Sequence, residues 1–197
     1  ILRRQRVLPL RVMLRDFAPS LDAGKAGTSQ NVEAYLLKLL GEQNHADAVR
    51  SLPELLKRGL AFVQFDGLDE VPRSHLPAIR QALVAFAEGE YRQCRIVVTC
   101  RTESYKKAEF RLESFPAPHE IAPLSNRDRA HFVHAWYREL EEVQPQFHGE
   151  GEACAASLLG AITTDRLREM AGNPFFLTAM AALHRPDKPL PDTSAEL

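Results

Sequence analysis

The chain has 197 residues, a length that suits one α/β domain with a small helical appendage. Its 25 Lys and Arg residues nearly balance its 26 Asp and Glu residues, so its overall charge does not indicate attraction to nucleic acid or to an anionic membrane. No stretch has the apolar length of a membrane span or of a signal peptide, and we therefore expect a cytoplasmic protein. Its three cysteines lack Cys-x-x-Cys spacing, which indicates free thiols.

The first predicted element is a strand over residues 7–17, where charged residues alternate with apolar ones towards the end. This pattern is typical of a strand with one less buried face near a sheet edge. Residues 18–31 are rich in Gly, Ser and Thr and predict a loop. Gly24 and Lys25 in this loop lack the G-x-x-x-x-G-K-[ST] spacing of a phosphate-binding loop, so we interpret the segment as a flexible loop.

Two helices and a second strand are expected next. Apolar spacing predicts helices over 32–43 and 51–58, the second of them started by Ser51. Residues 60–65 are almost entirely apolar. Such a run favours a parallel strand that is covered on both faces.

Three carboxylates, Asp66, Asp69 and Glu70, follow this strand directly. Ligands of open α/β sheets bind outside the carboxyl ends of the strands, and an apolar strand that ends in Asp is the Walker B pattern of P-loop NTPases. There the carboxylate helps to hold Mg²⁺, which needs only one or two such ligands. The alternative is a polar turn in which Asp-Gly serves the turn geometry. Three acids within five residues, however, repel one another unless a cation or solvent compensates.

A third strand, over residues 94–101, is expected after a helix over 74–88. Parallel strands joined by a crossover helix have their carboxyl ends at the same edge of the sheet. We therefore expect Arg101 to come within reach of a ligand held by Asp66 and to stabilise phosphate charge there. A salt bridge to the neighbouring acids, or a solvated loop position, is the alternative for Arg101.

The rest of the chain is predicted to be mainly helical. A polar connection over 105–118 and a short strand over 119–124 that leaves the sheet precede a long helix capped by Ser125. Pro174 suits the first position of the last helix. Three helices are expected after the long one, over 152–159, 164–171 and 175–183. A Pro-rich linker over 184–191 and the opening of a further helix follow, so the sequence looks like an excerpt from a longer protein.

Four of these stretches resemble, in order and spacing, the NACHT domain of the STAND class of signalling NTPases. Residues 62–71, FVQFDGLDEV, resemble its extended Walker B segment, and residues 8–16 resemble its second core strand. Residues 95–101 resemble its sensor-1 strand, and residues 167–177 resemble its lid segment with a Gly-x-Pro element. From the first to the last, they span nearly the whole chain.

The resemblance implies ATP and Mg²⁺ as ligands and gives roles to the matching residues. Asp66 would hold Mg²⁺ through water, while Asp69 and Glu70 would position or activate the attacking water. Arg101 would sense the γ-phosphate, and Pro174 would pack near the adenine. The first three roles also agree with the chemistry of the side chains, whereas Pro174 depends on the resemblance, with helix punctuation as the alternative.

The expected fold is therefore α/β. A mostly parallel, P-loop NTPase-like sheet flanked by helices is predicted over 1–124, and a small all-α lid over 125–186. A linker and the start of a following domain are predicted over 187–197. The family's phosphate loop is absent from the sequence and would lie upstream of Ile1, with its strand leaving a gap in the middle of the sheet. For this reason we expect the chain alone to bind nucleotide weakly or not at all.

The expected function is that of a switch. The module would bind and slowly hydrolyse ATP with Mg²⁺ and change its conformation or self-association, with neighbouring domains of the full-length protein as further partners. One alternative is an AAA+-like ATPase motor. The other is a scaffold whose site has decayed and no longer hydrolyses nucleotide.

Overall fold

The computed structural model describes residues 7–184, without the side chain of Gln146. The chain divides into two compact units, Ile1–His119 and Glu120–Leu197. The division comes a few residues before the expected boundary at Leu124. The predicted following domain, and all but the first residue of the predicted Pro-rich linker, lie outside the described residues.

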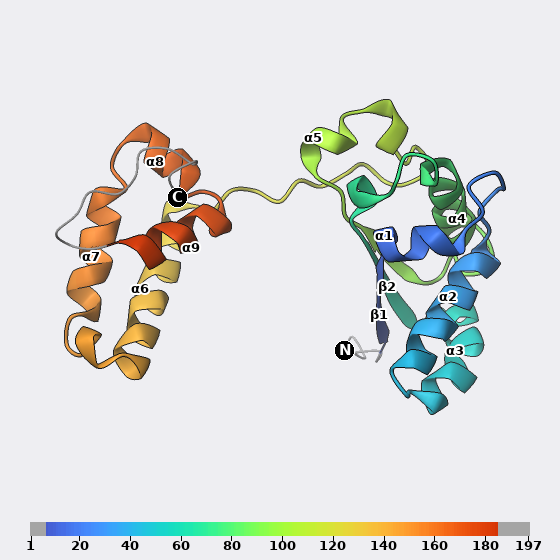
Figure 1. The fold of residues 1–197 in the computed structure, drawn as a ribbon, viewed down its shortest axis with the longest axis horizontal. Coiled ribbons are helices and arrows are strands. Elements are labelled where there is room, and N and C mark those ends of the chain that lie inside the picture. Colours follow the sequence, from blue (N-terminus) through green and yellow to red (C-terminus); the bar gives the residue numbers. More distant parts are fainter. Residues whose placement is uncertain (1–6, 185–197) are drawn as a thin grey trace, which may run out of the picture. The chain divides into compact units, whose positions relative to one another are not determined.

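The first unit contains a parallel sheet of three strands, which confirms an α/β fold (Figure 1). The strands are β1 (Leu8–Met13), β2 (Ala61–Asp66) and β3 (Arg95–Val98), in the order β1-β2-β3. Met13 pairs with Asp66, and Phe65 pairs with Val98, so all three carboxyl ends meet at one edge. The expected gap between strands is not present. Among the described residues, β3 has a strand neighbour on one side only.

Helices cover one face of this sheet (Figure 1). They are α2 (Ser29–Glu42) and α3 (Ala46–Lys57), between β1 and β2, and α4 (Leu76–Glu88), between β2 and β3. Both connections run in the same direction across the sheet, and crossovers of the usual right hand therefore put these helices on one side. The core beneath them is apolar, with the Phe65 and Phe86 rings edge to face at 5.8 Å.

The opposite face of the sheet is partly open, which corrects the expectation that both faces are covered. Along β2, the side chains of Val63 and Phe65 are fully buried against the helices, whereas those of Phe62 and Gln64 are partly exposed. The register neighbour Val97 on β3 is 43% exposed. An apolar run in the sequence therefore did not distinguish a covered face from an open one.

The first predicted strand was too long. The strand ends at Met13, and the chain turns into the short helix α1 (Leu14–Phe17), followed by a 3-10 turn over Ala18–Ser20. Leu14 and Phe17 are both fully buried. Their spacing of three residues suits a helical turn, whereas a strand would turn them to opposite faces.

The two helices after the loop begin earlier than predicted. A capping box between Thr28 and Asn31 starts α2, with the Thr28 hydroxyl accepting a hydrogen bond from the Asn31 backbone N–H at 3.2 Å. The helix α3 begins at Ala46 rather than at Ser51, so that Pro53 lies inside it. The predicted helix over 74–88 is confirmed as α4, which starts at Leu76.

The second unit is helical, as predicted. It consists of α6 (Asn126–Val143), α7 (Gly151–Ala161), α8 (Asp165–Met170) and α9 (Pro174–Leu183), with a 3-10 turn over Pro145–Phe147. A capping box between Ser125 and Asp128 starts α6, as expected from the sequence. Its own core contains Val133, Tyr137, Leu158, Leu177 and Met180.

The predicted strand over residues 119–124 is wrong, because no strand forms in this segment. Its side chains are mostly exposed, and Ile121 is 95% exposed. The Leu124 N–H donates to the Gly172 carbonyl at 2.7 Å, a contact within the second unit that belongs to no strand ladder. The preceding polar connection contains two short turns, α5 (Thr102–Tyr105) and a 3-10 turn over Ala108–Phe110. Within residues 7–184, no helix combines the length and apolar character needed to cross a membrane.

The difference between the two sheet faces can be measured. We expect Phe65→Ala to lower the free energy of opening of the first unit by about 3–5 kcal/mol, because it leaves a cavity under the helices. Val97→Ala, on the open face, should change it by less than about 1 kcal/mol. Hydrogen exchange of the β2 amides reports this unit separately from the second. Equal effects of the two substitutions would contradict the assignment of the faces.

Candidate functional site at the carboxyl edge of the sheet

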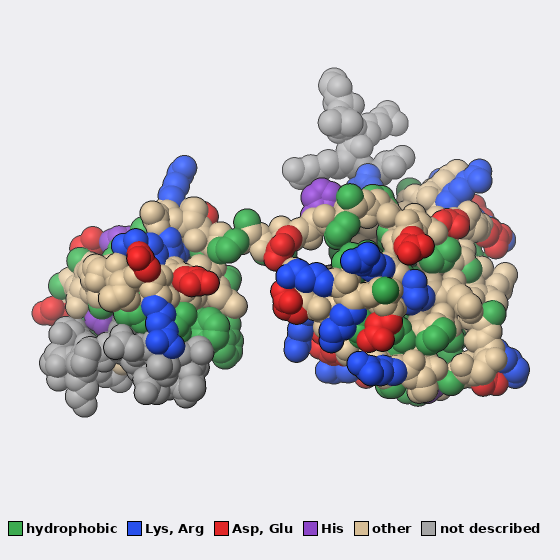
Figure 2. All heavy atoms as spheres, turned by 90° about the horizontal axis from the view of Figure 1, so that it is seen from above, with side chains coloured by type: hydrophobic (Ala, Val, Ile, Leu, Met, Phe, Trp, Pro, Cys, Tyr) green, Lys and Arg blue, Asp and Glu red, His purple; other side chains and the backbone are tan. Residues whose placement is uncertain are grey.

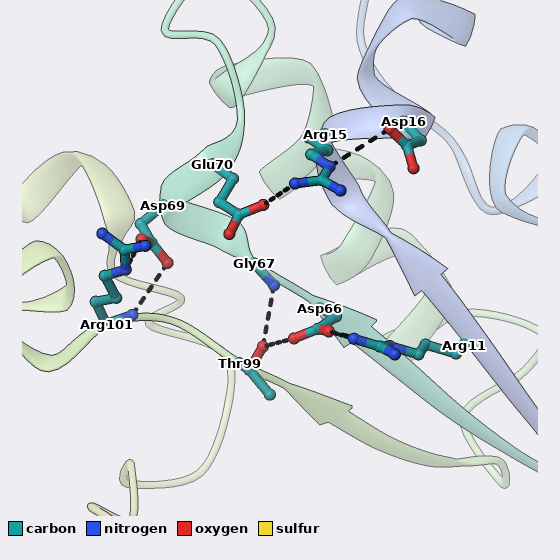
Figure 3. A network of polar contacts seen from close by, with 9 residues as sticks. All are labelled: Arg11, Arg15, Asp16, Asp66, Gly67, Asp69, Glu70, Thr99 and Arg101. Carbon is teal, nitrogen blue, oxygen red and sulfur yellow. Dashed lines mark hydrogen bonds and ion pairs between the residues drawn. The ribbon is translucent and has the colours of Figure 1, made fainter. Parts of the chain in front are cut away.

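A tight turn after β2 forms the centre of the candidate site. Gly67 follows the strand with a φ of 80°, a conformation that favours glycine, and the 3-10 turn Leu68–Glu70 comes next. The Leu68 side chain is fully buried, and its N–H donates to the Thr99 carbonyl at 2.9 Å. Leu68 thus anchors the turn in the core, and the acids Asp66, Asp69 and Glu70 lie at the edge where β2 and β3 end (Figure 3).

Asp66 is held by two partners, one on each neighbouring strand segment. The Thr99 hydroxyl donates to Oδ1 of Asp66 at 2.5 Å, and the same hydroxyl oxygen accepts the Gly67 N–H at 3.0 Å. The Arg11 guanidinium binds Oδ2, with Nε at 3.0 Å. The Thr99 hydrogen bond, followed by that of Arg11, lowers the pKa of Asp66 below its ordinary value of 3.8. Asp66 is thus a carboxylate at neutral pH with both oxygens engaged.

Asp69 pairs with Arg101. Its Oδ1 accepts the Arg101 backbone N–H at 3.0 Å, and its Oδ2 lies 3.3 Å from the Arg101 Nε. The Asp69 side chain is only 9% exposed, whereas that of Arg101 is 79% exposed. The predicted meeting of Arg101 with the acidic turn therefore occurs through Asp69 rather than through Asp66. Burial together with Asp69 raises the pKa of the neighbouring Cys100 thiol to about 11, so this thiol stays protonated and unreactive.

Glu70 pairs with Arg15, at 3.2 Å between Oε2 and an NH group. Arg15 also lies 3.6 Å from Asp16. Glu70 is the most exposed of the three acids, at 36%, against 21% for Asp66 and 9% for Asp69. Its carboxylate is therefore the one that solvent reaches best.

Sequence reasoning missed Arg11 and Arg15, which come from β1 and from the turn that follows it. The sequence feature that contains both arginines is the alternation of charged with apolar residues near the end of the first strand, which was interpreted as a less buried strand face. The strand register supplies the missing information, because Met13 lies beside Asp66 and places Arg11 on the same side of the sheet. The repulsion expected among the acids is relieved by three arginines (Figure 3).

The acids do not converge on a common point. Among the described residues, no group of three or more His, Cys, Asp or Glu side chains is arranged to hold a metal ion. Asp66 and the Thr99 hydroxyl nevertheless place two hard oxygens together. Both oxygens of Asp66 and the Thr99 hydroxyl are engaged with protein partners, so a Mg²⁺ ion, which keeps several waters and needs only one or two carboxylates, requires one of these contacts to open. Basic and acidic side chains are interspersed on the face of the first unit seen in Figure 2.

Pro174 starts α9 in the second unit. The side chain of Asn173 caps this helix by accepting the Phe175 N–H at 2.9 Å, and Pro174 occupies the first turn. Pro174 therefore occupies the helix start that the alternative interpretation gives it. The contact of Pro174 with adenine stays a prediction, because the structure describes the two units separately.

The segment around Gly24 and Lys25 is a loop, as predicted. Lys25 forms an ion pair with Asp22 at 3.0 Å, and the Gly24 N–H donates to the same carboxylate at 3.1 Å. The cation is thus occupied by its own loop, and the helix that follows is capped by Thr28.

Comparison of the sequence and the fold with models of known protein families, with curated proteins and with solved structures finds no match.

The hydrogen bond from Thr99 should control the acidity of Asp66. In Thr99→Val we expect the pKa of Asp66 to rise towards 3.8, because the main cause of its lowering is removed. Titration of the carboxyl carbons by NMR measures this change. The pKa of Asp128, lowered by Ser125 in the second unit, should not change and serves as an internal control. An unchanged pKa of Asp66 would contradict the role of Thr99.

The lowered pKa of Asp66 also predicts how the stability of the fold depends on pH. The pKa of Asp66 is lower in the folded state than in the unfolded state. The contribution of ionised Asp66 to the free energy of unfolding is therefore fully present above the unfolded pKa of about 4, and it is lost as the pH falls through the folded pKa. Unfolding by urea at a series of pH values below about 4 should therefore show a shallower loss of stability for Thr99→Val than for the unchanged protein. Identical slopes would argue against this contribution.

Proposed function

We propose that this chain forms part of a NACHT-type signalling NTPase, with a P-loop NTPase-like core and a helical lid, which uses ATP and Mg²⁺ to switch conformation. The observation that carries the proposal is the assembly of Asp66, Asp69, Glu70 and Arg101 at the carboxyl edge of a parallel sheet. This edge is where open α/β sheets bind their ligands. Three acids with an exposed arginine have the chemistry that phosphoryl transfer requires.

Asp66 and Thr99 would hold Mg²⁺, together with water and phosphate oxygens. Bound there, the ion would neutralise negative charge on the phosphates. Arg11 occupies Oδ2 of Asp66, so a cation at this oxygen requires the guanidinium to move away. The side chain of Arg11 is 63% exposed and has room to do so, and it would then be free to bind a phosphate oxygen.

The two other acids have different roles in this proposal. Glu70 is the more exposed and would accept the proton of the attacking water, with Arg15 holding its carboxylate in place. Both oxygens of Asp69 are engaged by Arg101, which makes Asp69 a positioning residue. Arg101 is exposed beyond this contact and would stabilise charge that develops on the γ-phosphate.

The open edge of β3 supports the presence of a further strand in the complete sheet. Among the described residues, β3 has a strand neighbour on one side only, so its other edge is free to pair. A strand that pairs there would end beside Thr99 and Arg101, which is where a phosphate loop is needed. Because backbone N–H groups and the Lys of such a loop make most phosphate contacts, we propose that the residues described here bind ATP weakly without it.

The switch itself would come from differential contacts. Bound nucleotide would favour one conformation of the protein over another. Slow hydrolysis would reverse this preference and so control self-association or contacts with neighbouring domains.

One observation favours a second candidate, a scaffold that does not hydrolyse nucleotide. Each of the three acids already has an arginine partner, so the network is neutralised without a metal ion. In that case the pairs Arg11–Asp66 and Arg15–Glu70 would serve to fasten β1 to the turn after β2.

Hydrolysis by the complete protein separates the two candidates. We expect Mg²⁺-dependent ATP hydrolysis that falls by about a hundredfold in Glu70→Gln, because the proton acceptor is lost, while ATP binding is retained. Glu54→Gln, an exposed position on α3, is the matched control and should hydrolyse ATP at the normal rate. Absence of hydrolysis from the unchanged protein would favour the scaffold, and normal hydrolysis by Glu70→Gln would disprove the role of Glu70.

A further inference from the structure

A pocket lies on the first unit, outside the candidate nucleotide site. It is open to solvent, has a volume of about 580 Å³ and shares no residue with the acidic turn. This volume is within the range of pockets that bind small molecules. Its floor is the surface of α4, at Pro77, Arg80 and Val84.

One wall of the pocket is the loop that contains Gly27. This loop lies directly on α4, since a Cβ atom at Gly27 would come within 2.0 Å of the Ala78 carbonyl oxygen and 2.8 Å of the Ala82 Cβ. Only glycine allows such a close approach. The wall is therefore fixed against the helix, and its position is part of the fold.

The other wall is the turn over residues 112–115. The Leu112 side chain is buried in the core of the unit, and its carbonyl accepts the Phe115 N–H at 3.0 Å. Glu113 and Ser114 lie on the rim of the pocket and are exposed. Both walls are therefore fixed to the rest of the unit, which favours a pocket that is formed before a ligand binds.

Arg80 gives the pocket its chemical character. Its Nε atom is buried and has no hydrogen-bond partner among the described residues. None of the acidic side chains within residues 7–184, Glu113 included, forms an ion pair with it. Arg80 lines the pocket, and an anionic group of a ligand there would give its guanidinium the charged partner that it lacks among the described residues.

We propose that this pocket binds a small organic acid. The acid group contacts Arg80, with Gln81 and Ser114 as neighbouring polar groups, and the apolar body lies against Val84 and Leu112. Glu113 on the rim disfavours ligands with several negative charges, so a monoanion is preferred over a nucleotide. The proposal does not depend on the NTPase function, because the two sites use different residues.

Naphthalene-1-carboxylate is a suitable probe, and its neutral analogue naphthalene-1-methanol isolates the effect of charge. In heteronuclear NMR spectra we expect the carboxylate to shift the amide signals of Gly27, Ala85 and Ser114. Arg80→Met keeps the length of the side chain but removes its donors, and it should weaken binding at least about tenfold. The alcohol should bind the unchanged protein with a similarly reduced affinity.

Arg92→Met is the matched control, since Arg92 is exposed and lies outside the pocket, and it should bind the carboxylate normally. Dispersed spectra of both variants establish that they are folded. The proposal is overturned if the carboxylate causes no shifts, if the shifts map to other residues, or if Arg80→Met or the alcohol gives unchanged affinity.

Discussion

The hydrogen bonds of the Thr99 hydroxyl hold the candidate site together. The hydroxyl donates to Asp66 at the end of β2 and accepts the Gly67 N–H. The backbone carbonyl of Thr99 accepts the Leu68 N–H. The last residue of one strand and the turn that follows it are thus tied to the end of the next strand. Because the turn cannot rotate independently, the directions of the acids are set by the sheet itself.

The arginines explain how three acids can share such a short turn. Each carboxylate has its own guanidinium, and the three cations come from β1, from the turn after β1 and from the end of β3. The side chains of Arg11, Arg15 and Arg101 are largely exposed, so each guanidinium has room to exchange its carboxylate for another partner. Such a site tolerates the absence of a ligand and still offers carboxylates to a cation and arginines to phosphate.

The sequence predicted what local patterns determine. The apolar run before Asp66, the capping box at Ser125 and the Asn-Pro start of α9 each specify an element through their nearest neighbours, and each is present in the structure. What depends on distant parts of the chain was missed. The partner of Asp66 follows from the strand register, which no local pattern encodes, and the open sheet face follows from the side on which both crossovers run. The false strand over 119–124 shows the same limit, since an extended segment becomes a strand only beside another one.

In the proposed function, a nucleotide-bound metal ion lies at the carboxyl edge of the sheet, on Asp66. Paramagnetic Mn²⁺ in complex with ATP tests it directly, because broadening of NMR signals near the metal ion detects even weak binding. The account predicts selective broadening of the Gly67 and Thr99 amide signals, and loss of that broadening in Asp66→Asn. Sharp signals at both residues, or equal broadening in Asp66→Asn, would contradict it.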